Sequence, residues 1–300
     1  MLSALDRLRY RVGKTGVRVP VVWYRHRSFT PSDVFLGCYP RSGSTWLRFM
    51  LFEILSGERA QFENVNSAFR GAGDHFQALP LLPGKGRLVG SHEAYRKEYG
   101  KAVYLVRDVR DVVLSYFALE SELGVSTPDF DEYLLEFLRG RGKRYGSWQV
   151  HVNSWLDSKA ARSGNLFLVR YHELRNDPEE VLFGLCRFLG ADIDRERIHI
   201  AVMNNSLEKM RAKEDELHAK PAMVYFPHKP QRGSHEEGRF VRSGKVGGWR
   251  ARLTEPQERL IEQYAGSTLL RIGCSLGAAA VASSEVEQQV SLAGSLASNG

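Results

Sequence analysis

The chain has 300 residues, of which 43% are hydrophobic and 11% aromatic. This ordinary globular composition excludes collagen-like, coiled-coil and largely disordered chains. The 42 Lys and Arg residues against 35 Asp and Glu give a net charge of +7, which favours an anionic partner such as a phosphate or sulfate ester, a nucleic acid or an acidic lipid. Three scattered cysteines without a C-x-x-C pair predict no disulfide framework or zinc site and fit a reducing cytoplasm.

The two ends of the sequence differ from its middle. The first 27 residues carry seven Lys or Arg residues against the single acidic Asp6, and the last 27 are mostly Ala, Ser, Gly, Val and Gln. We predict a basic leader over residues 1–30, one domain over residues 31–273 and a flexible tail over residues 274–300. No apolar run near the start is long enough for a membrane span or a signal peptide, while the basic leader leaves peripheral contact with a membrane surface open.

The pattern of elements predicts an α/β fold. Four short, continuous apolar runs predict buried parallel strands over residues 34–38, 88–90, 102–106 and 166–169. Amphipathic or capped segments predict helices over residues 45–55, 111–119, 177–189 and 254–264. This alternation predicts a single domain with a central parallel sheet flanked by helices, whose ligands gather at the carboxyl ends of the strands. The charged, Pro- and Gly-containing stretch 211–240 predicts a long loop, which we interpret as a lid.

The strongest local motif directly follows the first predicted strand, where residues 39–47 read YPRSGSTWL. Backbone N–H groups at such a strand–turn–helix joint point into one concavity, and the helix N-terminus adds partial positive charge. Arg41 and the hydroxyl groups of Ser42, Ser44 and Thr45 supply further donors, so the motif predicts a phosphate site. An ordinary joint with a serine cap is the alternative. The G-x-x-x-x-G-K-[ST] pattern of magnesium-dependent nucleotide hydrolases is absent.

Two further basic segments contain residues suited to an anion. Arg107 ends the third predicted strand, and Ser115 follows eight residues later in the next helix, so that one phosphate could contact both. Ion pairs of the arginines in this segment with neighbouring aspartates are the alternative. Residues 239–250 combine glycines, which let backbone amides approach a ligand closely, with the cations Arg242 and Lys245.

These three segments, in this order, resemble those of the sulfotransferases that use 3′-phosphoadenosine 5′-phosphosulfate (PAPS). The resemblance covers about residues 33–265 and implies a fold similar to that of the P-loop nucleotide kinases. It also implies an enzyme that transfers a sulfuryl group by in-line displacement to a hydroxyl, or less often an amine, of a small-molecule, lipid or sugar acceptor. No metal is implied.

The resemblance also assigns roles to residues. The donor-binding set comprises Arg41, Ser42, Gly43, Ser44, Thr45 and Trp46 around the 5′-phosphosulfate, Arg107 and Ser115 at the 3′-phosphate, Tyr171 beside the adenine, and Arg242, Ser243 and Gly244 in the loop that closes over the 3′-phosphate. The catalytic set comprises His92 as general base, Arg41 at the leaving oxygen and Ser115 as anchor of the 3′-phosphate. A neutral imidazole can accept the proton of the acceptor at cellular pH.

The sequence departs from the family pattern at some of these positions, and two other functions remain open. Arg41 stands where the family usually has Lys. Ser243 replaces a Lys of the third basic segment, residues 239–250, which we call the late loop. The dimer motif of the cytosolic animal enzymes is also altered near residues 250–259. The other functions are a P-loop kinase-like phosphotransferase, which would need ATP and magnesium, and a non-catalytic protein that binds polyanions or nucleic acid. Because the basic residues recur at strand ends beside Gly and Ser, a compact ligand is favoured over a nucleic acid.

Overall fold

A sheet of four parallel strands in the order β2–β1–β3–β4 lies at the centre of the computed structural model. The strands are β1 (Val34–Cys38), β2 (Leu88–Ser91), β3 (Lys101–Val106) and β4 (Leu166–Arg170). The four apolar runs thus form strands as predicted, within one residue at each end. The structure describes residues 18–122, 129–141, 143–219, 241 and 244–277.

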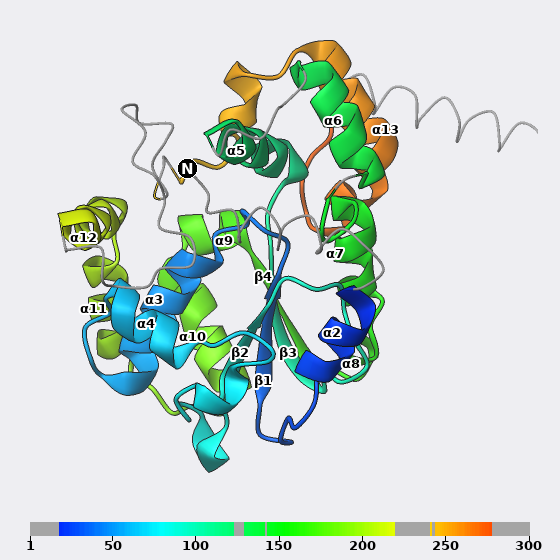
Figure 1. Ribbon diagram of the computed structural model, residues 1–300. Helices are drawn as coiled ribbons and strands as arrows, with labels where there is room; N and C mark the ends of the chain where they lie inside the picture. The colour runs from blue at the N-terminus through cyan, green and yellow to red at the C-terminus, as the bar shows by residue number, and fades with distance from the viewer. Residues whose placement is uncertain (1–17, 123–128, 142, 220–240, 242–243, 278–300) are drawn as a thin grey trace, which may run out of the picture.

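Helices cover both faces of the sheet (Figure 1). In chain order they are α2 (Arg18–Arg25), α3 (Ser44–Ser56), α4 (Phe62–Ala68), α5 (Val109–Glu122), α6 (Phe130–Arg139), α7 (Trp148–Leu156), α8 (Lys159–Arg162), α9 (Tyr171–Asn176), α10 (Pro178–Leu189), α11 (Arg195–Asn204), α12 (Leu207–Ala219) and α13 (Glu255–Arg271), with 3₁₀ turns at His75–Gln77, Pro83–Lys85 and Gly248–Ala251 (η4). None of the described helices is long and apolar enough to cross a membrane.

Alternation along β1 explains why its sequence is apolar at every position. Val34, Leu36 and Cys38 face a hydrophobic cluster formed with α3, α4, α10 and α11, whereas Phe35 faces a second cluster formed with α5, α6, α7 and α13. A strand that is buried on both faces has no exposed side to fill with polar residues. The continuous apolar run is therefore the sequence signature of a central strand.

Local signals end α3 and α10 within one residue of the predicted position, whereas α13 continues to Arg271, seven residues beyond its predicted end. Gly57 and Gly190 adopt left-handed backbone conformations at the ends of α3 and α10. The carboxylate of Asp177 accepts a hydrogen bond from the amide of Glu180 at the start of α10, and Thr254 forms a capping box with Gln257 at the start of α13.

Other predictions need correction or lie outside the described residues. Residues 211–219 form the last part of α12, so the prediction of a loop is wrong for them, and residues 220–240 lie outside the described part of the chain. Within the predicted basic leader, α2 is helical and His26 is buried, with its Nε2 2.6 Å from the hydroxyl of Tyr99. The tail beyond residue 277 also lies outside the description, so its predicted flexibility remains a prediction.

Aromatic stacking fixes α7 on the sheet. Trp155 is fully buried and stacks on Tyr104 of β3 at 4.8 Å and on Tyr99 at 5.4 Å between ring centroids. Its ring covers Gly37 of β1 so closely that a Cβ atom at residue 37 would overlap the indole. The glycine is therefore required for the close approach of α7 to the strand that leads into the first motif.

We predict that Gly37→Ala lowers the free energy of unfolding by about 1–3 kcal/mol, because the added methyl group forces the packed indole out of position. Urea denaturation of the variant and the wild type would measure this difference. Gly100→Ala is the matched control, since a Cβ there meets no atom within 4 Å and the expected change is within about 0.5 kcal/mol. Equal stability of the two variants would show that the approach of α7 does not depend on the glycine.

Candidate active site

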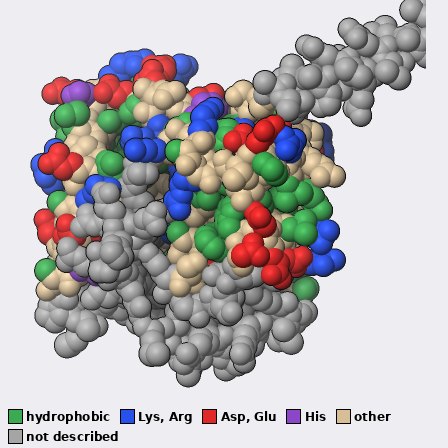
Figure 2. Space-filling view, turned by 90° about the horizontal axis from the view of Figure 1, so that it is seen from above, with side chains coloured by type: hydrophobic (Ala, Val, Ile, Leu, Met, Phe, Trp, Pro, Cys, Tyr) green, Lys and Arg blue, Asp and Glu red, His purple; other side chains and the backbone are tan. Residues whose placement is uncertain are grey.

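The predicted site residues meet at the carboxyl ends of the parallel strands. The first motif follows β1, His92 follows β2, Arg107 follows β3 and Tyr171 follows β4. In the view from above, which looks onto these ends, Lys and Arg side chains lie near the middle of the face (Figure 2). The topology therefore brings together residues that are far apart in the sequence, as expected for a parallel α/β sheet.

The loop between β1 and α3 has an unusual backbone. Arg41 has φ 72° and Gly43 has φ 100°, and both values lie in the left-handed region. Such a conformation is uncommon for a residue with a side chain and costs of order 1–3 kcal/mol. Gly43 is required for a second reason, because a Cβ there would lie 2.6 Å from the ring of Tyr171. The loop is thus held tightly against α9.

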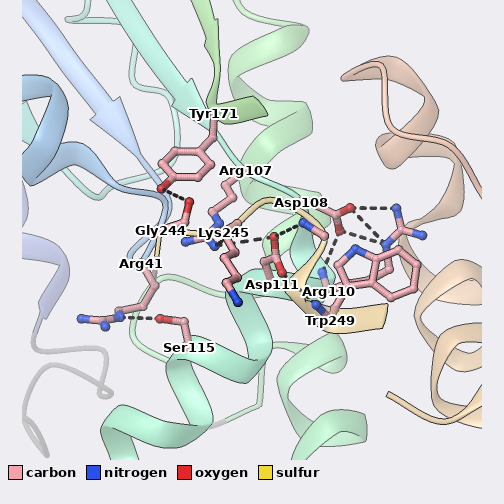
Figure 3. A network of polar contacts seen from close by, with 11 residues as sticks. Arg41, Arg107, Asp108, Arg110, Asp111, Ser115, Tyr171, Gly244, Lys245 and Trp249 are labelled. Carbon is pink, nitrogen blue, oxygen red and sulfur yellow. Dashed lines mark hydrogen bonds and ion pairs between the residues drawn. The ribbon is translucent and has the colours of Figure 1, made fainter. Parts of the chain in front are cut away.

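The side chains of this loop carry donors that face the other parts of the site. Arg41 donates from Nε to the hydroxyl of Ser115 in α5 at 2.9 Å, which joins the two predicted phosphate contacts directly (Figure 3). The hydroxyl of Ser42 is buried and has no hydrogen-bond partner among the described residues. A buried hydroxyl without a partner costs free energy, so an oxygen-rich ligand would satisfy it.

Arg107 links three segments of the site. Its Nη2 donates to the carbonyl oxygen of Lys245 at 2.9 Å and lies 3.5 Å from the carboxylate of Asp111. Its guanidinium also stacks on the ring of Tyr171, 4.5 Å from the centroid, and the Tyr171 hydroxyl donates to the carbonyl of Gly244 at 3.1 Å (Figure 3). The Nε of Arg107 is buried without a hydrogen-bond partner among the described residues.

Asp111 fixes the late loop to α5. Its two carboxylate oxygens accept hydrogen bonds from the amides of Gly247 and Trp249, each at 3.1 Å. Burial raises the pKa of Asp111, although Arg107 and the two amides favour the ionised form. The ring of Trp249 also packs under Arg110, whose guanidinium lies 4.0 Å from it and is paired with Asp108 at 2.7 Å. The ion pairs that were the alternative interpretation of this segment are therefore present.

Trp46 lies beside Tyr171 and is fixed by a hydrogen bond from its indole. Its indole Nε1 donates to the carbonyl of Asn205 at 2.8 Å, and its ring meets Tyr171 edge-on at 6.3 Å. Asn205 is itself fixed, because its side-chain oxygen accepts from Lys213 at 2.7 Å. The two aromatic rings predicted to border an adenine thus lie beside each other.

His92 lies directly beside the end of β1. Its Nδ1 is 3.0 Å from the carbonyl oxygen of Cys38 and 3.3 Å from the Cys38 sulfur. His92 is exposed at the surface, while the protein packed around its ring partly desolvates it and so lowers its pKa; the pairing with Cys38 outweighs this effect and raises that pKa. The same pairing lowers the pKa of the buried Cys38 thiol. No hydrogen bond joins Nε2 of His92 to any residue that the structure describes.

The structure thus brings Arg41, Trp46, Arg107, Ser115 and Tyr171 together. The predicted site residues Ser42, Gly43, Ser44, Thr45, His92 and Gly244 lie in the segments that meet there. Arg242 and Ser243 lie outside the described part of the chain.

A family model described as a sulfotransferase domain matches residues 89–273, more than half of the chain. The chain belongs to the sulfotransferase family. Mouse sulfotransferase 1B1 is 28% identical to it over 257 residues, which cover 78% of this chain and 82% of the relative. The resemblance to the PAPS-dependent sulfotransferases is therefore confirmed.

Solved structures show the same fold. Mouse sulfotransferase SULT7A1, solved in complex with PAP, matches with a TM-score of 0.60 and 21% identity over 83% of this chain and 89% of its own. Retinol dehydratase, solved with androsterone and the inactive cofactor PAP, gives a TM-score of 0.61 and 20% identity over 83% of each chain. The predicted fold class of this sulfotransferase is therefore confirmed.

Three residues that hold the sulfotransferase site in place could not be identified from the sequence. Asp111 was considered only as an ion-pair partner, although its main contacts are the two amides of the late loop. Cys38 and His151, which contact His92, carried no signal in the sequence because each stands inside an apolar run or an amphipathic helix. Only the pairing of β1 with β2 and the packing of α7 bring them to His92.

We predict that Asp111→Ala accelerates hydrogen exchange at the amides of Gly247 and Trp249 by about tenfold or more. The reason is that each amide loses a charge-assisted hydrogen bond worth roughly 1.5–3 kcal/mol. Exchange followed by NMR would measure the change. Asp157→Ala, which removes an exposed ion pair with Arg271, is the control and should leave both amides unaffected. Unchanged exchange in Asp111→Ala would mean that other contacts hold the loop.

Proposed function

We propose that this sulfotransferase uses PAPS as its donor and transfers the sulfuryl group to a hydroxyl of a small molecule, with His92 as general base. The donor is proposed because two structures of the same fold were solved with PAP, the desulfated form of PAPS. The residues of this chain give separate support. The observation that carries the proposal is that two buried donors, the Ser42 hydroxyl and the Nε of Arg107, have no hydrogen-bond partner among the described residues and stand in the segments that follow β1 and β3.

The donor set fits a ligand with two separated phosphate groups. The buried Ser42 hydroxyl and the buried Nε of Arg107 lack partners among the described residues, and they belong to the two different segments predicted for the 5′ and 3′ ends of the donor. Arg41 reaches Ser115, so it spans the distance between these segments. In this proposal Trp46 and Tyr171 border the adenine, and Gly244 lies in the loop over the 3′-phosphate.

The proposed reaction needs a base, a cation and a fixed geometry. The oxygen of the acceptor forms a bond to sulfur while the bond from sulfur to the bridging phosphate oxygen breaks, and adenosine 3′,5′-bisphosphate leaves. His92 takes the proton of the acceptor on Nε2, and Arg41 together with the loop amides neutralises charge on the leaving phosphate. Such a transfer gains most from positioning and from cationic donors.

An acceptor with an apolar body fits the surroundings of His92. The ring of Tyr145 meets the imidazole of His92 edge-on, with 5.7 Å between the ring centroids. The ring of Tyr116 lies 6.3 Å, centroid to centroid, from that of Tyr39, the residue that follows Cys38. Phe62 and Phe69 are buried in the core. We therefore propose that the acceptor is a phenol or an apolar alcohol. The activity assay described below also includes sugar and lipid acceptors.

We predict that adenosine 3′,5′-bisphosphate binds the wild type with micromolar affinity in the presence of EDTA. Arg107→Ala should weaken this binding by about 10- to 100-fold, since it removes charge-assisted hydrogen bonds worth roughly 1.5–3 kcal/mol. Isothermal titration calorimetry would measure both affinities.

Arg195→Ala is the matched control for this titration, because Arg195 pairs with Glu180 on the exposed surface. Its affinity should equal that of the wild type. Absence of binding to a folded wild type would contradict the donor assignment. Stabilisation against heat by ATP with magnesium, and not by adenosine 3′,5′-bisphosphate, would favour the kinase-like alternative.

We predict that His92→Ala lowers kcat by about 10²–10⁴-fold and leaves the affinity for adenosine 3′,5′-bisphosphate unchanged. The wild-type rate should fall as the pH decreases, with a midpoint above 6.5, because a base must be neutral to accept a proton and the pKa of His92 is raised. A ³⁵S-labelled donor and a panel of phenols, sterols and sugars would provide the assay.

The control for this experiment is His199→Ala, which changes an exposed histidine paired with Glu179. Its kcat and pH profile should match the wild type. Full activity of His92→Ala would show that another group takes the proton, or that the acceptor loses it without a base.

A further inference from the structure

The backbone of His92 is held by a second histidine. His151 of α7 lies with its Nε2 3.0 Å from the carbonyl oxygen of His92. A carbonyl oxygen can only accept a hydrogen bond, so Nε2 of His151 must carry the proton. Its other nitrogen, Nδ1, lies 2.9 Å from the hydroxyl of Tyr104 in β3. Tyr104 and His151 are 0% and 1% exposed, so neither can exchange these partners for water.

The protonation state of His151 agrees with this arrangement. Burial, with a smaller effect of the nearby His92 ring, lowers the pKa of His151 to about 4 despite the opposing effect of the hydrogen bond to the His92 carbonyl. The ring is therefore neutral at cellular pH, with one protonated nitrogen and one lone pair. Burial also raises the pKa of Tyr104, which keeps its hydroxyl protonated as the donor to Nδ1. Each hydrogen bond in the series from Tyr104 through His151 to the carbonyl of His92 therefore has one donor and one acceptor.

The imidazole of His92 is fixed by the same reasoning. Its Nδ1 contacts the carbonyl oxygen of Cys38 at 3.0 Å and must therefore donate a hydrogen to it. In the neutral ring this leaves the lone pair on Nε2. That nitrogen is the one which makes no hydrogen bond to the described residues, and it is the atom that a general base needs.

Two neighbours of His151 hold the residues that follow His92. Trp155 donates from its indole nitrogen to the carbonyl of Glu93 at 3.2 Å, and the hydroxyl of Ser154 accepts from the amide of Tyr95 at 3.0 Å. The spacing of three and four residues places these side chains and His151 on one part of the α7 surface. Since Trp155 is packed against β3, this surface of α7 is a rigid support for residues 92–95.

We propose that His151 is a positioning residue for the reaction: through its hydrogen bonds to Tyr104 and to the His92 carbonyl, and together with Cys38, it holds His92 with the lone pair of Nε2 presented to the acceptor. The inference rests on the proposed role of His92 as base. In the proton step the acceptor hydrogen moves to Nε2, the other hydrogen stays on Nδ1 in its hydrogen bond to the carbonyl oxygen of Cys38, and His151 remains neutral.

The tautomers can be tested without an acceptor. In protein labelled with ¹⁵N-histidine, NMR at pH 8 should show His92 protonated on Nδ1 and His151 protonated on Nε2, and His151 should remain neutral when the pH is lowered to 6. Single His→Gln variants would assign the signals. A hydrogen on Nε2 of neutral His92, or a charged His151 at pH 6, would overturn the inference.

A double-mutant cycle separates positioning from a general structural effect. With PAPS and 2-naphthol as the probe acceptor, His151→Phe should lower kcat by about 10- to 100-fold, as expected for a misplaced catalytic group, and leave the affinity for adenosine 3′,5′-bisphosphate unchanged. In the His92→Ala background the same change should cost less than twofold. His151→Gln, whose amide can both donate and accept, should recover most of the wild-type rate.

Each contrary result has a distinct meaning. An equal loss from His151→Phe in both backgrounds would show a structural role and overturn the inference, and so would no loss in the wild-type background. Full activity of His92→Ala would refute the base itself, and the positioning role would fail with it. A large effect of His92→Ala combined with none of His151→Phe would overturn only the role of His151.

Discussion

The carboxyl end of β1 is the constraint on which the rest of the site depends. β1 lies between β2 and β3, and its last residue, Cys38, leads directly into the loop that carries Arg41 and Ser42. The carbonyl of the same residue accepts the hydrogen bond from His92. A single strand end therefore sets both the donor loop and the proposed base, so their separation is fixed by covalent geometry and by the register between β1 and β2.

The cations that follow β3 are held by ion pairs with aspartates. Arg107 and Arg110 each face an aspartate, which lowers the cost of placing cations in a partly buried region before any ligand arrives. Asp111 uses its remaining acceptor capacity on the amides of the late loop, so the charge that balances Arg107 also locates that loop. An anion that binds to Arg107 adds to a network that is already oriented, which reduces the entropy lost on binding.

Much of the fold could be predicted from the sequence, and the reason is physical. Continuous apolar runs, caps such as Asp177 and helix-ending glycines such as Gly190 are local signals, and the strands and helices that they predict are present. The length of α12 could not be predicted, because residues 211–219 are highly charged and carry no clear apolar stripe. Cys38 and His151 could not be identified as neighbours of His92, since they are 54 and 59 residues away from it and only the tertiary structure joins them.

The two halves of the site differ in what holds them, and this difference fits a two-substrate transfer. His92 is fixed by buried groups of β1, β3 and α7 that are almost inaccessible to water, so its geometry does not depend on a ligand. In the late loop Trp249 is buried and its amide is held by Asp111, whereas Lys245 and Val246 are exposed and the carbonyl of Lys245 accepts from Arg107. Local opening costs less where fewer apolar contacts are lost. In the proposed reaction, the exposed part of the late loop can therefore move as a nucleotide enters or leaves while His92, the proposed base, keeps its position relative to β1.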